Sequence, residues 1–137
     1  MMEQSRPVNP PHSMSDWQPR VGIILGSGLG GFVDAMNVSA EMEYNAVPGL
    51  PASVVPGHAG RFVYGRIGEV NVVAAQGRVH LYEGFTASEV TAGVCLLAAM
   101  GVELLILTNA AGLVNEDFQV GDWMQINDHL NLTGTSP

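Results

Sequence analysis

Residues 21–36, VGIILGSGLGGFVDAM, decide the fold class, because an apolar run leads into a glycine-rich turn and then into a helical pattern. A short, nearly all-apolar run that ends in glycines is typical of a strand buried on both faces of a sheet. Residues 31–36 predict the start of a helix. The stretch therefore predicts one buried strand of a sheet that carries helices.

A hairpin is expected in the middle of the chain. Residues 61–67 and 70–76 are rich in β-branched and aromatic side chains and are separated by only two residues, which predicts an antiparallel pair. The preceding residues 41–60 contain three prolines and three glycines, so that segment is expected to be mostly loop with room for one short strand. The sheet is therefore expected to contain at least one antiparallel pair.

A helix and two further strands are expected after the hairpin. Thr86, with Glu89 three positions later, forms a capping-box pattern that opens a helix over residues 87–100. Residues 103–108 predict a buried strand and residues 120–126 another strand. The predicted fold class is α/β, a three-layer domain with a central mixed β-sheet flanked by helices.

The composition narrows the class of function. The chain has 137 residues, 47% of them hydrophobic, which is enough to bury the core of one domain. Thirteen acidic against five basic residues give a net charge of −8, and no basic cluster is present, which argues against nucleic-acid binding. The polar, proline-rich residues 1–20 predict a loose N-terminal arm and not a secretory signal.

Two features bear on localisation. The apolar residues 92–107 are interrupted by Gly101 and Glu103, which favours a helix and a strand of a soluble domain over a membrane span. Cys95 is the single cysteine, so a disulfide framework is excluded and a cytoplasmic location fits best. Within its apolar run Cys95 is expected to be a small core residue and not a reactive thiol.

The glycine-rich turn is the first candidate anion site. Backbone N–H groups between a buried strand and a helix can point at an anion, and the hydroxyl of Ser27 adds a donor beside Gly26 and Gly28. A plain tight turn is about as plausible from this segment alone. A dinucleotide site is poorly supported, because the expected acidic residue about twenty positions later is missing.

Residues 76–84, QGRVHLYEG, are the most informative stretch. If the hairpin strand continues through them, Arg78, His80 and Tyr82 alternate onto one face. Arginine suits an oxyanion, histidine can donate to a phosphate or move a proton, and tyrosine can close over a sugar. Glu83 could orient His80 by accepting its second ring proton. The alternative is the polar outer face of an edge hairpin, and the density of such groups favours a site.

Residues 108–112, TNAAG, follow the apolar run of the last buried strand. Ligands bind open α/β sheets beyond the carboxyl ends of strands, so Asn109 and the N–H of Ala110 could complete an anion cradle with Ser27 and Arg78. A close-packed turn remains the alternative. His58, in the loop VPGHAGRF, could approach the same ligand or be a solvated surface residue.

No metal site is expected, because the four histidines lie far apart without paired ligand spacing.

The segments GIILGSGLGGF, VPGHAGRFVYG, QGRVHLYEGFT and TNAAG...NEDFQVGDWMQINDHLNLTG, in this order, resemble the N-terminal half of the trimeric type of purine nucleoside phosphorylases. The resemblance covers residues 21–137, and it implies a truncated phosphorylase-type domain. Methylthioadenosine phosphorylases share the fold and reaction and are the closest rival. The family usually has a second glycine where Leu113 stands, and a positive φ there would cost about 1 kcal/mol or more.

The resemblance implies an enzyme of purine salvage. Purine ribo- and deoxyribonucleosides such as inosine and guanosine would be cleaved by inorganic phosphate to the free base and (deoxy)ribose 1-phosphate. No cofactor or metal is implied, and the full-length relatives are expected to be cytoplasmic homotrimers without nucleic-acid or membrane partners. The alternative from another class is a non-catalytic anion-binding or association module. Matched residue by residue, the phosphate contacts would be Ser27, His58, Arg78, His80 and the N–H of Ala110, and the ribose contact would be Tyr82. From the residues themselves, the expected catalytic groups are His80, which can move a proton, and Glu83, which could orient it.

Overall fold

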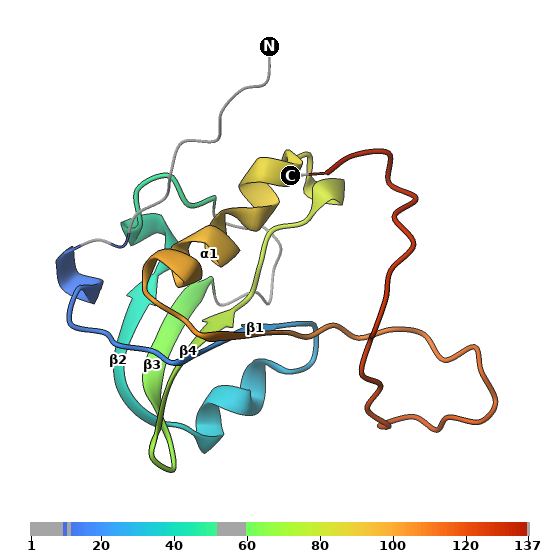
Figure 1. The fold of residues 1–137 in the computed structure, drawn as a ribbon, viewed down its shortest axis with the longest axis horizontal. Helices are drawn as coiled ribbons and strands as arrows, with labels where there is room; N and C mark the ends of the chain where they lie inside the picture. Colours follow the sequence, from blue (N-terminus) through green and yellow to red (C-terminus); the bar gives the residue numbers. More distant parts are fainter. Residues whose placement is uncertain (1–9, 11, 52–59, 137) are drawn as a thin grey trace.

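The computed structural model describes residues 10, 12–51 and 60–136, in which five strands form one mixed sheet (Figure 1). The strands are β1 (Val21–Leu25), β2 (Asn37–Glu43), β3 (Arg61–Ile67), β4 (Val70–Gln76) and β5 (Leu104–Leu107). The α-helix is α1 (Ala87–Ala99), and the short 3-10 helices are η1 (His12–Met14), η2 (Gly30–Ala35), η3 (Tyr44–Ala46) and η4 (Leu81–Glu83).

The sheet order is β2-β3-β4-β1-β5, with both kinds of pairing. β2, β3 and β4 form an antiparallel meander, which confirms the predicted hairpin over residues 61–76. β1 lies between β4 and β5 and is parallel to both, with Ile24 opposite Ala75 on one side and Leu107 on the other. Because parallel strands end at the same edge, the carboxyl ends of β4, β1 and β5 meet there.

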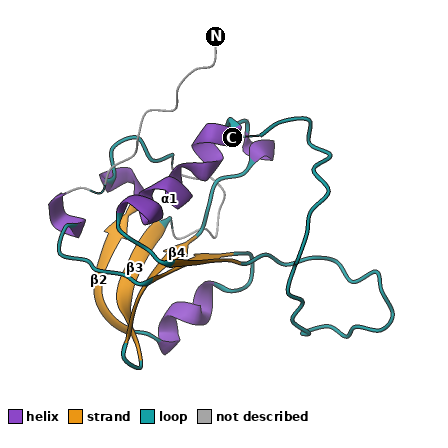
Figure 2. Cartoon of the chain, in the orientation of Figure 1, coloured by secondary structure: helices purple, strands orange, loops and turns teal. Residues whose placement is uncertain are grey.

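Two cores cover the two faces of the sheet, and Figure 2 shows helices on both sides of it. On one face Leu96 and Leu97 of α1 are fully buried in a cluster with Phe62 of β3. On the other face Val33 of η2 is buried in a cluster with Val63 of β3. The predicted three-layer α/β architecture with a mixed central sheet is confirmed.

The start of α1 is fixed by its cap, as predicted. Thr86 Oγ1 accepts a hydrogen bond from the Glu89 N–H at 3.2 Å, and Glu89 Oε2 accepts one from the Thr86 N–H at 2.8 Å. These bonds satisfy N–H groups that have no partner within the helix. The backbone and side-chain hydrogen bonds from Thr86 also lower the pKa of the Glu89 carboxyl.

The sequence predicted a loose arm over residues 1–20, but the second half of this segment packs against the domain. Met14 of η1 is 1% exposed, and Trp17 is buried with its ring stacked on that of Tyr64 at 5.1 Å. The polar composition of the segment obscured these two large apolar side chains, which belong to the core on the α1 face. Residues 1–9 and 11 lie outside the described residues.

β2 begins earlier than expected. The sequence predicted mostly loop with one short strand over residues 41–60, whereas β2 spans Asn37–Glu43 and pairs with β3 through a bulge at residues 38–40. Most of its side chains are exposed, because β2 is an edge strand. Its apolar content was therefore too low to give a clear strand signal.

Three expectations near the second half of the chain were wrong. Cys95 is exposed on α1 and is not a core residue. Residues 120–126 form no strand, because nothing pairs with them in the described part of the chain, and they lie in the extended segment that leaves the sheet in Figure 1. β5 is a strand as predicted, but Leu104 and Leu107 are 55% and 61% exposed and not buried.

Within the residues that the structure describes, no helix is both long enough and apolar enough to cross a membrane.

Candidate functional site

The loops that follow β1 and β5 are in direct contact. Thr108 Oγ1 accepts a hydrogen bond from the Gly26 N–H at 2.9 Å and donates one to the Ile24 carbonyl oxygen at 3.0 Å. A Cβ atom on Gly26 would lie 2.6 Å from the Thr108 carbonyl oxygen and 2.7 Å from Asn109 Cα. Only glycine allows this approach, so the glycine-rich turn and the TNAAG segment are held together as one unit.

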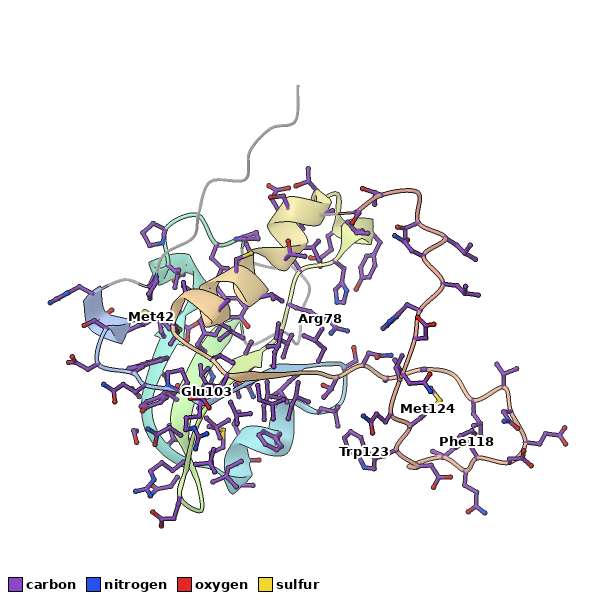
Figure 3. The ribbon with its side chains drawn as sticks, in the orientation of Figure 1. Met42, Arg78, Glu103, Phe118, Trp123 and Met124 are labelled. Carbon is purple, nitrogen blue, oxygen red and sulfur yellow. The ribbon has the colours of Figure 1, made fainter. Side chains whose placement is uncertain are left out.

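Arg78 brings the loop after β4 to the same place. Its Nη1 donates a hydrogen bond to the Thr108 carbonyl oxygen at 2.9 Å, and the side chain is half-buried. In Figure 3 Arg78 lies between α1 and the start of the extended C-terminal segment. The structure therefore brings together the three segments that the sequence singled out at the carboxyl ends of β1, β4 and β5.

The structure describes most of the donors that were expected at this junction, but not all of them. Ser27, Asn109 and Ala110 are exposed beside the Gly26–Thr108 contact, so a ligand can reach them. Gly28 has φ of +81°, a backbone conformation that glycine adopts without strain. Anion binding by Ser27 and the Ala110 N–H stays a prediction. His58 lies outside the described residues.

The expected strand through residues 76–84 is wrong. β4 ends at Gln76, Gly77 has φ of +103°, and η4 follows at Leu81–Glu83. A residue with that φ takes the chain out of the extended conformation, so the alternation of side chains across a strand does not apply.

His80 and Tyr82 nevertheless lie side by side. Their rings stack at 4.8 Å with an interplanar angle of 12°. Tyr82 is 77% exposed, so its outer ring face and hydroxyl are accessible to a ligand. Glu83 Oε1 accepts a hydrogen bond from the His80 backbone N–H at 2.8 Å and fixes the main chain of His80. Orientation of the imidazole through its ring proton by Glu83 stays a prediction.

Two residues that the sequence did not single out, Tyr44 and Gln76, stabilise the loops of the site through side-chain hydrogen bonds to backbone carbonyl oxygens. The Tyr44 hydroxyl donates a hydrogen bond to the Gly77 carbonyl oxygen at 2.6 Å. Gln76 Nε2 donates to the Gly30 carbonyl oxygen at 2.8 Å and so joins the end of β4 to η2. Both partners are distant in sequence, and hydrogen bonds of this kind leave no periodic pattern from which they could be predicted.

The cavity behind Arg78 is much smaller than a site for a nucleoside. A cavity of about 30 Å³ lies between Tyr44, Phe62, Val79 and Val90, behind Arg78. Pockets for small organic ligands are typically about 300 Å³ or larger. This cavity therefore does not hold a ligand of the size of a nucleoside.

Two further expectations concern backbone strain and metals. Among the described residues only glycines have positive φ, so Leu113 does not carry the strain that a left-handed conformation would impose. The same part of the chain contains no group of three or more histidine, cysteine, aspartate or glutamate residues that could hold a metal ion.

Comparison with known proteins places the chain beside one group of enzymes. Residues 20–137 match the model of the phosphorylase superfamily. Purine nucleoside phosphorylase 1 of Bacillus subtilis is 49% identical over 119 residues, which are 87% of this chain and 44% of that protein. Purine nucleoside phosphorylase of Bos taurus is 46% identical over 124 residues, which are 90% of this chain and 43% of that protein.

Solved structures that resemble this chain are of the same group of enzymes. A purine nucleoside phosphorylase in complex with ribose-1-phosphate matches with a TM-score of 0.73 and 34% identity, over 80% of this chain and 40% of that one. The enzyme of Schistosoma mansoni in complex with adenosine matches with a TM-score of 0.72 and 34% identity, over 80% and 38%. The chain thus spans less than half the length of the relatives it matches.

Proposed function

The chain belongs to the phosphorylase superfamily, and we propose that the protein it forms is a purine nucleoside phosphorylase. Its substrates are purine ribo- and deoxyribonucleosides such as inosine and guanosine, together with inorganic phosphate. The names of the relatives support this assignment, and so does the ribose-1-phosphate complex among the similar structures, since that sugar phosphate is a product of the proposed reaction.

One observation carries the proposal: Arg78 and Gly26 both bond to Thr108, so the three loops form one junction at the carboxyl edge of the sheet. A guanidinium binds phosphate oxygens through its forked N–H donors. Backbone N–H groups of a glycine-rich turn add further donors at such an edge. Phosphate is therefore proposed to bind here, with the following contacts: Ser27, His58, Arg78, His80 and the N–H of Ala110.

The proposed reaction is a displacement at the sugar. As the N-glycosidic bond breaks, its electron pair leaves with the purine, and a phosphate oxygen bonds to the anomeric carbon. The purine takes up one proton, which balances the proton that hydrogen phosphate loses when it becomes the sugar phosphate. The phosphate dianion stabilises the positive charge that develops on the sugar and attacks from the opposite face. Binding and orientation by the protein supply such catalysis, and the proposal includes no metal or organic cofactor.

The stacked pair is proposed to serve the sugar side of the site. The accessible Tyr82 ring is proposed to close over the ribose, and His80 behind it to donate to phosphate or move a proton. The Glu83 carboxylate, bonded to the His80 N–H, is proposed to keep that histidine in place. The Tyr82 and His80 rings thus link the ribose to the phosphate.

A homotrimer in the cytoplasm is also proposed. The trimer rests on the resemblance to trimeric purine nucleoside phosphorylases. The location is supported by the low cysteine content of these 137 residues, in which Cys95 is the single cysteine.

The test is phosphate-dependent cleavage of inosine by the protein at the full length that its gene encodes, beside an Arg78→Ala variant. Free hypoxanthine should form only when phosphate is present, and the variant should lose about 10²-fold or more in kcat/KM. Arg66→Ala is the matched control, because Arg66 pairs with Glu69 at the far turn of the β3–β4 hairpin. That control should retain full activity.

Three results would contradict the assignment. Cleavage without phosphate would indicate a hydrolase. A clear preference for methylthioadenosine over inosine would favour the related methylthioadenosine phosphorylases. Binding of phosphate by calorimetry without cleavage of any purine nucleoside would indicate a non-catalytic anion-binding module.

A further inference from the structure

The hydroxyl of Tyr44 is buried directly behind the Arg78 loop. Tyr44 is 5% exposed, and its ring lies 4.7 Å from that of Phe62 at an angle of 55°. Its hydroxyl donates to the Gly77 carbonyl oxygen at 2.6 Å, and burial raises the pKa of the phenol. The neutral, donating form is therefore the stable one here.

The carbonyl that Tyr44 holds belongs to the peptide group whose nitrogen is that of Arg78. Gly77, with φ of +103°, turns the chain out of β4 at this point. A hydrogen bond to its carbonyl oxygen fixes the plane of the Gly77–Arg78 peptide and so the direction in which the Arg78 side chain departs. The other end of that side chain is fixed by the bond from Nη1 to the Thr108 carbonyl oxygen.

Tyr44 is itself anchored independently of any ligand. Its backbone N–H donates to the Gly60 carbonyl oxygen at 2.8 Å, and the Gly60 N–H donates to the Gln76 carbonyl oxygen at 2.9 Å. Tyr44 is thus linked to the end of β4 twice: its backbone reaches Gln76 by way of Gly60, and its side chain bonds to Gly77 directly. Its ring packs in the core with Phe62, which fixes the position of the hydroxyl that bonds to the Gly77 carbonyl oxygen.

We propose that Tyr44 is a positioning residue: through the Gly77 carbonyl it sets the orientation of Arg78 and thereby the affinity for inorganic phosphate. The inference rests on the proposed function, because it takes Arg78 to be a phosphate ligand. In this inference Tyr44 is buried and does not contact the substrate, but it controls the orientation of Arg78, which does. A guanidinium displaced by about 1 Å would lose much of its effect on a bound oxyanion.

The test compares Tyr44→Phe with the wild-type protein by phosphate calorimetry and by steady-state kinetics. The Kd and KM for phosphate should rise about tenfold, whereas the KM for inosine should stay within about twofold. Tyr64→Phe is the matched control: its hydroxyl accepts a hydrogen bond from the Gln18 N–H at 3.3 Å, away from the loops. That variant should keep the wild-type phosphate affinity.

A second control separates positioning from general loss of stability. Leu97→Val loosens the same core but at the start of β1, where Leu97 lies beside Gly22, and it leaves the packing of Tyr44 on Phe62 intact. It should therefore lower the unfolding temperature without weakening phosphate binding. All affinities are measured at a temperature at which circular dichroism shows every variant folded. A lower unfolding temperature of Tyr44→Phe with unchanged phosphate affinity would overturn the inference.

The double variant shows whether Tyr44 acts through Arg78. In an Arg78→Ala background, Tyr44→Phe should cause no further loss of phosphate affinity, whereas two independent effects would multiply. If the two losses of phosphate affinity multiply, the inference about Tyr44 is wrong, but the phosphate site at Arg78 is not called into question. Unchanged phosphate affinity in the single Arg78→Ala variant would instead contradict the phosphate site itself, together with everything that depends on it.

Discussion

The Thr108 hydroxyl accepts a hydrogen bond from the Gly26 N–H at 2.9 Å, and this one side chain joins the end of β5 to the glycine-rich turn after β1. It also donates to the Ile24 carbonyl oxygen at 3.0 Å, so both hydrogen-bonding roles of the hydroxyl are used. The junction of the proposed phosphate site therefore depends on a residue that is not itself proposed to touch phosphate.

Thr108→Val should weaken this junction. Valine has the shape of threonine but leaves the Gly26 N–H without its acceptor, which should lower the free energy of unfolding by about 1–3 kcal/mol. Urea unfolding followed by circular dichroism measures the change. Thr135→Val, in the exposed C-terminal segment, is the control and should change stability by no more than about 0.5 kcal/mol. Equal effects of the two substitutions would contradict a specific role for the Thr108 hydroxyl.

Gly26→Ala should open the same junction by steric overlap. The new Cβ would lie 2.6 Å from the Thr108 carbonyl oxygen, so backbone must move, at a cost of about 1–3 kcal/mol and with weaker phosphate binding. Gly93→Ala is the opposite case, because an added Cβ there meets nothing within 4 Å inside α1. It should stabilise the protein by about 0.5–1 kcal/mol. A Gly26→Ala variant as stable as the wild type would show that the contact is not tight.

The charge on Glu89 should make stability depend on pH in the acid range. Hydrogen bonds from the Thr86 backbone and hydroxyl lower the pKa of this carboxyl in the folded protein. Its contribution is therefore fully present above the unfolded pKa of about 4.3 and is lost as pH falls from there through the folded pKa. Glu89→Gln keeps a capping side chain but removes this titration.

Urea unfolding between about pH 3 and 7 tests this expectation. Wild type and Glu89→Gln should differ near neutral pH, with the wild type more stable, and should converge in acid. Glu116→Gln, in the exposed segment after β5, is the charge-matched control and should not differ from the wild type in this way. Parallel curves for wild type and Glu89→Gln at every pH would contradict the expectation.

The 137-residue chain, expressed by itself, should self-associate through β5. This strand is at one end of the sheet order, and Leu104, Ile106 and Leu107 are all at least 40% exposed on it. An apolar edge strand is a template for pairing with another copy. Sedimentation velocity should therefore show a mean mass that rises with concentration.

Leu107→Lys should reduce this association, because a charge on an edge strand opposes pairing. Val120→Lys makes the same kind of change in the extended segment, where Val120 is 96% exposed, and should have less effect. A sharp, monomeric unfolding transition that does not depend on protein concentration would contradict self-association through β5.

The fold was largely predictable because its signals are local. The apolar run of β1, the hairpin of β3 and β4 and the Thr86–Glu89 cap each follow from residues adjacent in sequence. Met14, Trp17 and Cys95 were placed wrongly because burial is decided by what packs on a side chain, which local composition does not contain. A strand at residues 120–126 had the right composition but finds no partner in the described chain.

The sequence predicted which three segments meet at the candidate site, but not the geometry of the residues within them. Arg78 and residues 108–112 were expected at one edge because parallel strands end together. The strand through His80 and Tyr82 was wrong because Gly77 adopts positive φ, a choice that glycine permits but does not force. The bond from Tyr44 to Gly77 joins residues 33 positions apart and became visible only once the chain was folded.

The place of β1 in the sheet also affects how the protein is made. Among the five described strands β1 is synthesised first, yet both of its neighbours, β4 and β5, come later in the chain. The antiparallel meander of β2, β3 and β4 can form from consecutive segments, whereas the apolar residues of β1 stay exposed on the nascent chain until β4 emerges. The order of synthesis therefore delays the burial of this pentapeptide, which is among the most buried segments of the folded sheet.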